Sequence, residues 1–155
     1  MVFAKDESKH ILTGPALIAD MPIYRRNFVT GEEYYVVFTK ETIAKLVERY
    51  SKNNMLNSVN LQHDSDSFTT GATLVESYFV DKSRGIAPKE FDIADGSWIC
   101  SFKITDEALW DQIVNTDEFN GFSVEVIANL EEKLGSEKPK DQDEIDKLID
   151  ELLKK

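Results

Sequence analysis

Short runs of alternating apolar and polar residues in the first third of the chain predict β-strands. Residues 10–14 form the first run, Gly14-Pro15 interrupts it, and residues 16–19 resume it. Residues 21–26 are expected to be extended or to turn, because a proline pushes the residue before it out of the helical region. Residues 34–38 are rich in β-branched and aromatic side chains, which predicts a further strand.

Two segments of the body instead repeat apolar residues at helical spacing. Residues 39–53 place four of them on one face, with Thr39 as the expected N-terminal cap. Residues 105–115 form a second such segment, with Thr105 as the expected cap and acidic residues in the first turn, where the helix dipole favours them. The inward-facing residues expected in the two helices are Ile43, Leu46, Val47, Tyr50, Leu109, Trp110, Ile113 and Val114.

The remaining apolar runs predict strands over residues 58–63, 71–81, 97–104 and 122–130, with 71–81 returning antiparallel to 58–63. Residues 82–96 contain a proline and two glycines and predict a mobile surface loop. Strands that do not alternate strictly with helices indicate an α+β fold, built on a mainly antiparallel sheet or a small β-barrel flanked by helices.

The last 24 residues differ in pattern from the body. Residues 132–140 are expected to form a linker, and residues 141–155 an amphipathic helix with acid-first i,i+4 charge pairs. The apolar stripe of this helix consists of Ile145, Leu148, Ile149, Leu152 and Leu153. We expect residues 1–131 to form one domain, and the helix to pack on that domain or on a partner.

The composition limits the functional classes. The 155 residues suit one domain, and 41% hydrophobic residues predict a globular fold. A formal net charge of −11 argues against nucleic acids and anionic membranes as partners. Cys100 is the only cysteine, so an intrachain disulfide is excluded, and its apolar strand predicts a buried thiol. With neither a secretory signal nor a membrane-length apolar run in the sequence, an intracellular location is the expectation.

An isolated polar residue in the last apolar strand is the first candidate for chemistry. Ser123 follows Gly121-Phe122, and alternation puts Ser123 and Glu125 on the face opposite Phe122. His63 lies in another predicted strand. A neutral imidazole can take the serine proton during attack on a carbonyl, so the two residues could be the nucleophile and base of acyl transfer. A strand serine and an unrelated surface histidine would give the same pattern.

Six segments that occur in order along residues 12–130 carry a more specific signal. They are Thr13-Gly14-Pro15-Ala16-Leu17-Ile18, Pro22-Ile23-Tyr24-Arg25-Arg26, Glu33-Tyr34-Tyr35-Val36-Val37-Phe38, Asn60-Leu61-Gln62-His63-Asp64, Val75-Glu76-Ser77-Tyr78 and Gly121-Phe122-Ser123-Val124-Glu125. Together they resemble the prohead (capsid-maturation) serine proteases of tailed phages, particularly the branch found in defective Bacillus prophages. Each segment is weak alone, and their order and spacing make the resemblance specific.

The resemblance implies a fold related to herpesvirus assemblin, with Ser123 as the nucleophile and His63 as the base. The herpesvirus enzymes use a second histidine as third member, but His10 lies outside the matching segments. Glu125 shares the face of Ser123, and Glu76 lies on the strand expected to pair with that of His63, so either could be the third catalytic residue. A dyad that needs no acid is the remaining alternative.

The resemblance also implies a place and partners. A prohead protease digests scaffold protein, extensions of the major capsid protein and often itself, inside the assembling procapsid in the host cytoplasm, and it could act as a homo-oligomer. We expect no cofactor and no metal, since His63, Asp64 and Asp66 match no familiar zinc spacing. A catalytically inactive capsid-assembly module that keeps the fold, or a small-molecule hydrolase, would compete with this interpretation. The presence of both Ser123 and His63 favours the protease.

Overall fold

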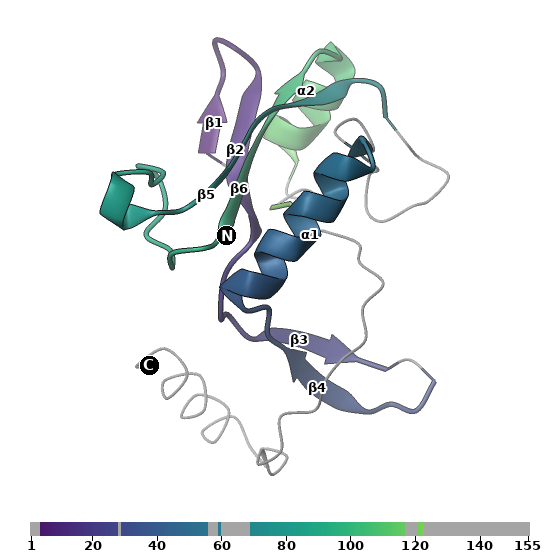
Figure 1. The fold of residues 1–155 in the computed structure, drawn as a ribbon. Coiled ribbons are helices and arrows are strands. Elements are labelled where there is room, and N and C mark those ends of the chain that lie inside the picture. Colours follow the sequence, from purple (N-terminus) through teal and green to yellow (C-terminus); the bar gives the residue numbers. More distant parts are fainter. Residues whose placement is uncertain (1–3, 28, 56–58, 60–68, 117–120, 123–155) are drawn as a thin grey trace.

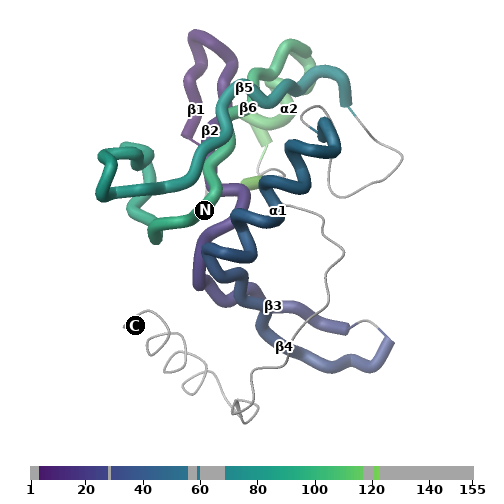
Figure 2. Tube along the Cα trace, in the orientation of Figure 1, coloured from purple at the N-terminus to yellow at the C-terminus, as the bar shows by residue number. Residues whose placement is uncertain are grey.

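The computed structural model describes residues 4–27, 29–55, 59, 69–116 and 121–122 (Figures 1 and 2). Its helices and strands, in chain order, are β1 (Ala4–Asp6), β2 (Ile11–Leu17), β3 (Ile23–Arg26), β4 (Glu33–Val36), α1 (Lys40–Lys52), β5 (Ala72–Phe79), the 3-10 turn η2 (Lys82–Arg84), β6 (Trp98–Ile104) and α2 (Glu107–Asn115). The predicted strands 58–63 and 122–130, the linker and the amphipathic helix lie outside the described residues, except that Val59 and Phe122 are described.

The main sheet has four antiparallel strands in the order β1-β2-β6-β5, and β3 pairs with β4 in a separate two-stranded ribbon. In Figure 1 the ribbon extends away from the sheet, near the end of α1 that follows β4. This arrangement confirms the α+β, mainly antiparallel prediction. Within the described part of the chain the sheet is open and no closed barrel is formed.

The two helices begin at side chains that satisfy free backbone N–H groups. Thr39 Oγ1 accepts from Thr42 N at 3.2 Å and starts α1, as predicted. For α2 the predicted cap is wrong: Asp106, not Thr105, accepts the backbone N–H of Leu109, at 3.0 Å. The Thr105 hydroxyl instead donates to the carbonyl of Gly71, which ties the start of α2 to β5.

The predicted break at Gly14-Pro15 is also wrong, because β2 continues through it. The register of β2 against β6 shifts between Pro15 and Leu17, and such an irregularity lets a strand accommodate a residue without an N–H. His10, which was expected in this strand, lies in the preceding turn with φ of +50°. β1 was not predicted from the sequence; it pairs with β2 across this turn.

Both helices pack on one face of the main sheet. One buried cluster joins α2 to the sheet and consists of Leu12, Ala72, Ile104, Leu109, Trp110 and Ile113. A second joins α1 to the sheet and consists of Leu17, Ala19, Phe38, Ile43, Trp98 and Cys100. Phe102 packs against both clusters. On the other face, Ile99 packs with Val80 and with Ile93 from the 82–96 segment, so part of that segment is core.

Candidate active site

Of the four predicted site residues, Glu76 is the one that the structure describes; His63, Ser123 and Glu125 lie outside the described residues. The neighbours of His63 and Ser123 in the sequence are nevertheless informative. Phe122, immediately before Ser123, contacts Phe102 edge to face with ring centroids 4.9 Å apart. Val59, four residues before His63, accepts a backbone hydrogen bond from Thr69 N at 2.9 Å.

Phe122 and Val59 pack against the same buried cluster, between the sheet and α2. These two residues come from segments more than 60 positions apart in the sequence. In the sequence, Val59 precedes His63 by four residues and Phe122 precedes Ser123 by one. The chain therefore enters both candidate segments from one region of the core.

Glu76 owes its orientation to an irregularity in β5. Leu74 pairs with Phe102 and Glu76 pairs with Ser101, so β5 has one more residue than β6 in this interval. In a regular strand Glu76 would lie opposite Cys100 and share the apolar face with Leu74. The extra residue, a β-bulge, instead allows Leu74 to pack on the helix-covered face while Glu76 points to the other.

The Glu76 carboxylate is held by a buried hydroxyl. Ser101 Oγ donates to Glu76 Oε2 at 2.6 Å, and the Ser101 side chain is fully buried. A distance of this length is typical of a charge-assisted O–H···O⁻ bond. Burial and then the nearby Glu76 charge raise the pKa of Tyr78, which lies on the same strand. The glutamate is thus fixed at one oxygen although its side chain is exposed.

His10 occupies a different environment. Its ring stacks on Trp110 with centroids 4.5 Å apart and an angle of 6°, and its Nδ1 lies 3.8 Å from Glu107 Oε1. Trp110 belongs to the core on the helix side of the sheet, whereas Glu76 lies on the opposite face. His10 therefore packs on α2, at the cluster that Phe122 and Val59 also join.

Other chemistries have little support in the described part of the chain. Cys100 is buried as predicted, and burial raises its thiol pKa to about 12, so it is no thiolate nucleophile at neutral pH. Among residues 4–27, 29–55, 59, 69–116 and 121–122, no three or more His, Cys, Asp or Glu side chains are grouped as metal ligands. None of the helices in those ranges is both long and apolar enough to span a bilayer.

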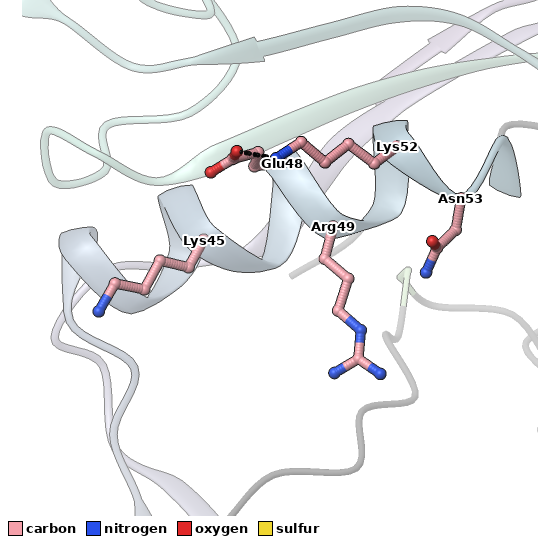
Figure 3. Close-up of a pocket in the computed structure, with 5 residues that line it drawn as sticks. All are labelled: Lys45, Glu48, Arg49, Lys52 and Asn53. Atoms are coloured by element: carbon pink, nitrogen blue, oxygen red, sulfur yellow. Dashed lines mark hydrogen bonds and ion pairs between the residues drawn. The ribbon is translucent and has the colours of Figure 1, made fainter.

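An open hollow on α1 is lined by charged and polar side chains (Figure 3). Its residues are Lys45, Glu48, Arg49, Lys52 and Asn53. Lys52 and Glu48 form an ion pair at 2.5 Å, and Lys45 and Arg49 extend from the same helix. None of the predicted site residues contributes to this hollow, and solvated charges of this kind are usual on an exposed helix face. It does not define a substrate cleft.

Ser101 is the residue of this region that the sequence prediction missed. A signal existed, because Ser101 is an isolated polar residue within the apolar strand Trp98–Ile104, as Ser123 is in its own predicted strand. The partner could not be predicted, because the bulge that brings Glu76 opposite Ser101 shifts the register of β5 by one residue.

The described geometry is that of an antiparallel α+β domain in which one exposed carboxylate, Glu76, is held by a buried serine. Comparison with family models shows that the chain belongs to the family described as "Putative phage serine protease XkdF", whose model matches residues 2–132. The matched span includes His63, Glu76, Ser123 and Glu125. No curated protein and no solved structure matches the chain.

Proposed function

We propose that this phage serine protease is the endopeptidase of capsid maturation, with Ser123 as nucleophile and His63 as general base. Its substrates would be the scaffold protein and extensions of the major capsid protein, and the chain could also cleave itself. It would act inside the assembling procapsid in the host cytoplasm. Digestion confined to this compartment would remove scaffold without exposing host proteins to the enzyme.

The observation that supports the proposal most is the packing of Phe122 and Val59 on one buried cluster. Catalysis by serine and histidine needs two segments, distant in the sequence, to bring one hydroxyl within hydrogen-bond reach of one imidazole. Ser123 follows Phe122 directly, and strand alternation would turn its side chain away from the apolar cluster that Phe122 joins. The family match supports the same assignment, because it covers both segments.

The reaction would proceed in two steps. The Ser123 oxygen attacks the scissile carbonyl while His63 takes the hydroxyl proton, which it then gives to the leaving amine as the C–N bond breaks. A water molecule, activated by the same imidazole, hydrolyses the acyl-enzyme and restores the serine. An acid that accepts the second ring N–H would orient the imidazole. Glu76, one oxygen of which is held by Ser101, and Glu125 are the two candidates for this acid.

The test uses the two histidines of the chain as a matched pair. Wild type, Ser123→Ala, His63→Gln and His10→Gln are each incubated with purified phage scaffold protein and major capsid protein, and fragments are followed by gel and mass spectrometry. We expect fragments from wild type and His10→Gln, and none from Ser123→Ala or His63→Gln. Equal cleavage by wild type and Ser123→Ala would exclude this serine as the nucleophile.

A capsid-assembly module without protease activity is the second candidate, and one observation favours it. The β3–β4 ribbon exposes Tyr24, Tyr34 and Tyr35, which lie between 38% and 48% accessible, and exposed aromatic side chains are common in protein interfaces. This candidate predicts that wild type co-sediments with scaffold or capsid protein and produces no fragments. It also predicts no labelling of Ser123 by a fluorophosphonate.

A further inference from the structure

The β3–β4 ribbon has two faces with different surroundings. Side chains that pair directly across the ribbon lie on one face, and successive pairs alternate between the two faces. Ile23 pairs with Val36, and both pack against the cluster between the sheet and α1, so their face is the inner one. The alternate pairs lie on the outer face, whose four exposed residues are Tyr24, Tyr35, Arg26 and Glu33.

The two tyrosines of the outer face are held in a fixed arrangement. Their rings meet edge to face, with centroids 5.9 Å apart and an angle of 67°. The Tyr24 hydroxyl donates to Glu33 Oε1 at 2.8 Å, yet Tyr24 and Tyr35 are 48% and 39% exposed. Side chains that are already ordered lose little entropy on binding, and tyrosine and arginine are enriched among the residues that dominate binding energy.

The charged residues of the outer face do not pair within the chain. Arg26 and Glu33 lie directly opposite each other, where opposite charges usually attract. Glu33 bonds to Tyr24 instead, and Arg26 forms no ion pair with any of the described residues. Because a carboxylate can accept several donors, Glu33 can receive a guanidinium as well as the Tyr24 hydroxyl.

The charge of the ribbon differs from that of the chain as a whole. Residues 21–36 contain two arginines and two glutamates and are therefore neutral, whereas the whole chain has a formal net charge of −11. Two copies of so acidic a chain repel each other over most of their surface. A face with locally balanced charge is where a second copy can approach without a like-charge penalty.

We propose that the outer face of the ribbon binds the same face of a second copy of this chain. A two-fold axis parallel to the strands lays β3 of one chain on β4 of its partner, because the rotation exchanges the two strand positions. Tyr24 then contacts the partner's Tyr35, and Arg26 binds the partner's Glu33. The symmetry repeats both contacts, so the face is complementary to itself. This association is independent of the proposed protease activity.

The area of this contact sets the expected affinity. Each strand of the ribbon has four residues, and interfaces of small area belong to weak, reversible complexes. We therefore expect the full chain to show a monomer–dimer equilibrium with a Kd of about 10–500 µM. Sedimentation equilibrium from about 5 µM to 1 mM covers this range. A wild-type chain that stays monomeric throughout would overturn the inference.

The two neighbouring arginines provide a variant and its matched control. Arg26→Glu sets a like charge against the partner's Glu33 and should raise the Kd at least about thirtyfold. Arg25→Glu changes the net charge equally, but Arg25 pairs with Tyr34 on the inner face and should raise the Kd less than about threefold. Tyr35→Ser should raise it about tenfold. An unchanged Kd in Arg26→Glu, or equal effects of both arginine variants, would contradict the proposed surface.

Charge exchange tests the alignment of the two ribbons. Glu33→Arg alone should weaken association as Arg26→Glu does, because arginines then face each other. An equimolar mixture of the two variants restores opposite charges at both contacts and should associate about as tightly as wild type. Mixing cannot repair a ribbon that is damaged within its own chain, so recovery identifies an intermolecular contact. A mixture that associates no better than its separate components would refute the proposal.

Discussion

The main sheet and the β3–β4 ribbon have similar strand-forming residues but very different surroundings. In β6, Trp98, Ile99, Cys100 and Ser101 are buried in succession, because β2 and β5 flank the strand and apolar clusters cover both faces. In the ribbon each strand has a single partner, and three of its tyrosines are more than one third exposed. Strand propensity is thus shared by both regions, while burial distinguishes them.

Local interactions maintain the ribbon where packing does not. At the end of the ribbon away from its turn, Ile23 and Val36 pack against the cluster between the sheet and α1. At the turn, Asn27 N donates to Glu32 O and Asn27 O accepts from Gly31 N. An isolated hairpin of this length is marginally stable in water, so the stability of the ribbon depends on these contacts at its two ends. The main sheet is stabilised by the burial of apolar side chains. Substitutions in the sheet should therefore lower the free energy of unfolding more than substitutions in the ribbon.

The largest effect is expected in the centre of the sheet. Ile99→Ala removes a fully buried side chain that packs with Val80 and Ile93, and should lower the free energy of unfolding by about 2–5 kcal/mol. Urea denaturation followed by tryptophan fluorescence measures the change. Val75→Ala is the control, because Val75 is 49% exposed on the neighbouring strand and should cost much less. Equal losses of unfolding free energy in Ile99→Ala and Val75→Ala would mean that burial does not determine the cost of these substitutions.

Two glycines with nearly equal φ angles give the next comparison. Gly96, with φ of +81°, precedes β6, and an added methyl group would collide with Cβ of Lys40 on α1. Gly31, in the ribbon turn, has φ of +73° and no atom near the added methyl. We expect Gly31→Ala to cost about 1 kcal/mol from backbone strain alone, and Gly96→Ala about 2–4 kcal/mol from strain and overlap. Similar costs would show that the α1 contact is loose.

Alkaline pH should weaken the core by a smaller amount. Burial raises the pKa of Cys100 from 9.0 to about 12, so folding favours the protonated thiol. That stabilisation is complete below pH 9 and is lost as pH rises toward 12, because the unfolded chain releases the proton first. At pH 10 the loss should be about 1.4 kcal/mol. The pKa of Tyr50, raised mainly by burial to about 12, contributes with the same sign.

Denaturation of wild type and Cys100→Ala at pH 7, 9 and 10 measures the thiol contribution. The variant should start from a lower stability at pH 7 and decline less steeply above pH 9. In the ribbon, the pKa of Tyr24 is raised by its hydrogen bond to Glu33, and this side chain is about half exposed, so Tyr24→Phe should leave the pH dependence nearly unchanged. An identical decline in wild type and Cys100→Ala would contradict the assignment to Cys100.

The same contrast explains how far the sequence could predict the fold. Periodicity identified α1, α2, β5 and β6, because each has an apolar face long enough to give a clear pattern. It failed at residues 14 and 15, where a glycine and a proline looked like a break although the strand passes through them. Pairing with β6 outweighs the local preference there. The cap of α2 was misplaced by one residue, since Thr105 and Asp106 can both accept a backbone N–H and only the register of the helix decides between them.

The candidate site shows a similar limit. The motif resemblance singled out Glu76 by its segment, and alternation alone would have turned its side chain toward the apolar face beside Leu74. The bulge reverses that orientation, and a bulge has no periodic signature in a strand of eight residues. Thr13 and Ser101 lie 88 positions apart, so their contact appears only once β2 and β6 are paired. The sequence could thus identify single candidate residues, but not the hydrogen-bond partners that the fold gives them.

The smallest effect is expected at the tip of the ribbon, where Val29 is 95% exposed. Val29→Ser should change the free energy of unfolding by less than about 0.5 kcal/mol, because the folded and unfolded chains hydrate this side chain almost equally. Introduced into the Ile99→Ala background, it should add nothing further, since the two residues share no cluster. A coupling above about 0.5 kcal/mol would mean that the ribbon tip and the centre of the sheet interact energetically. Additivity would instead mean that the ribbon tip can vary without affecting the stability of the sheet.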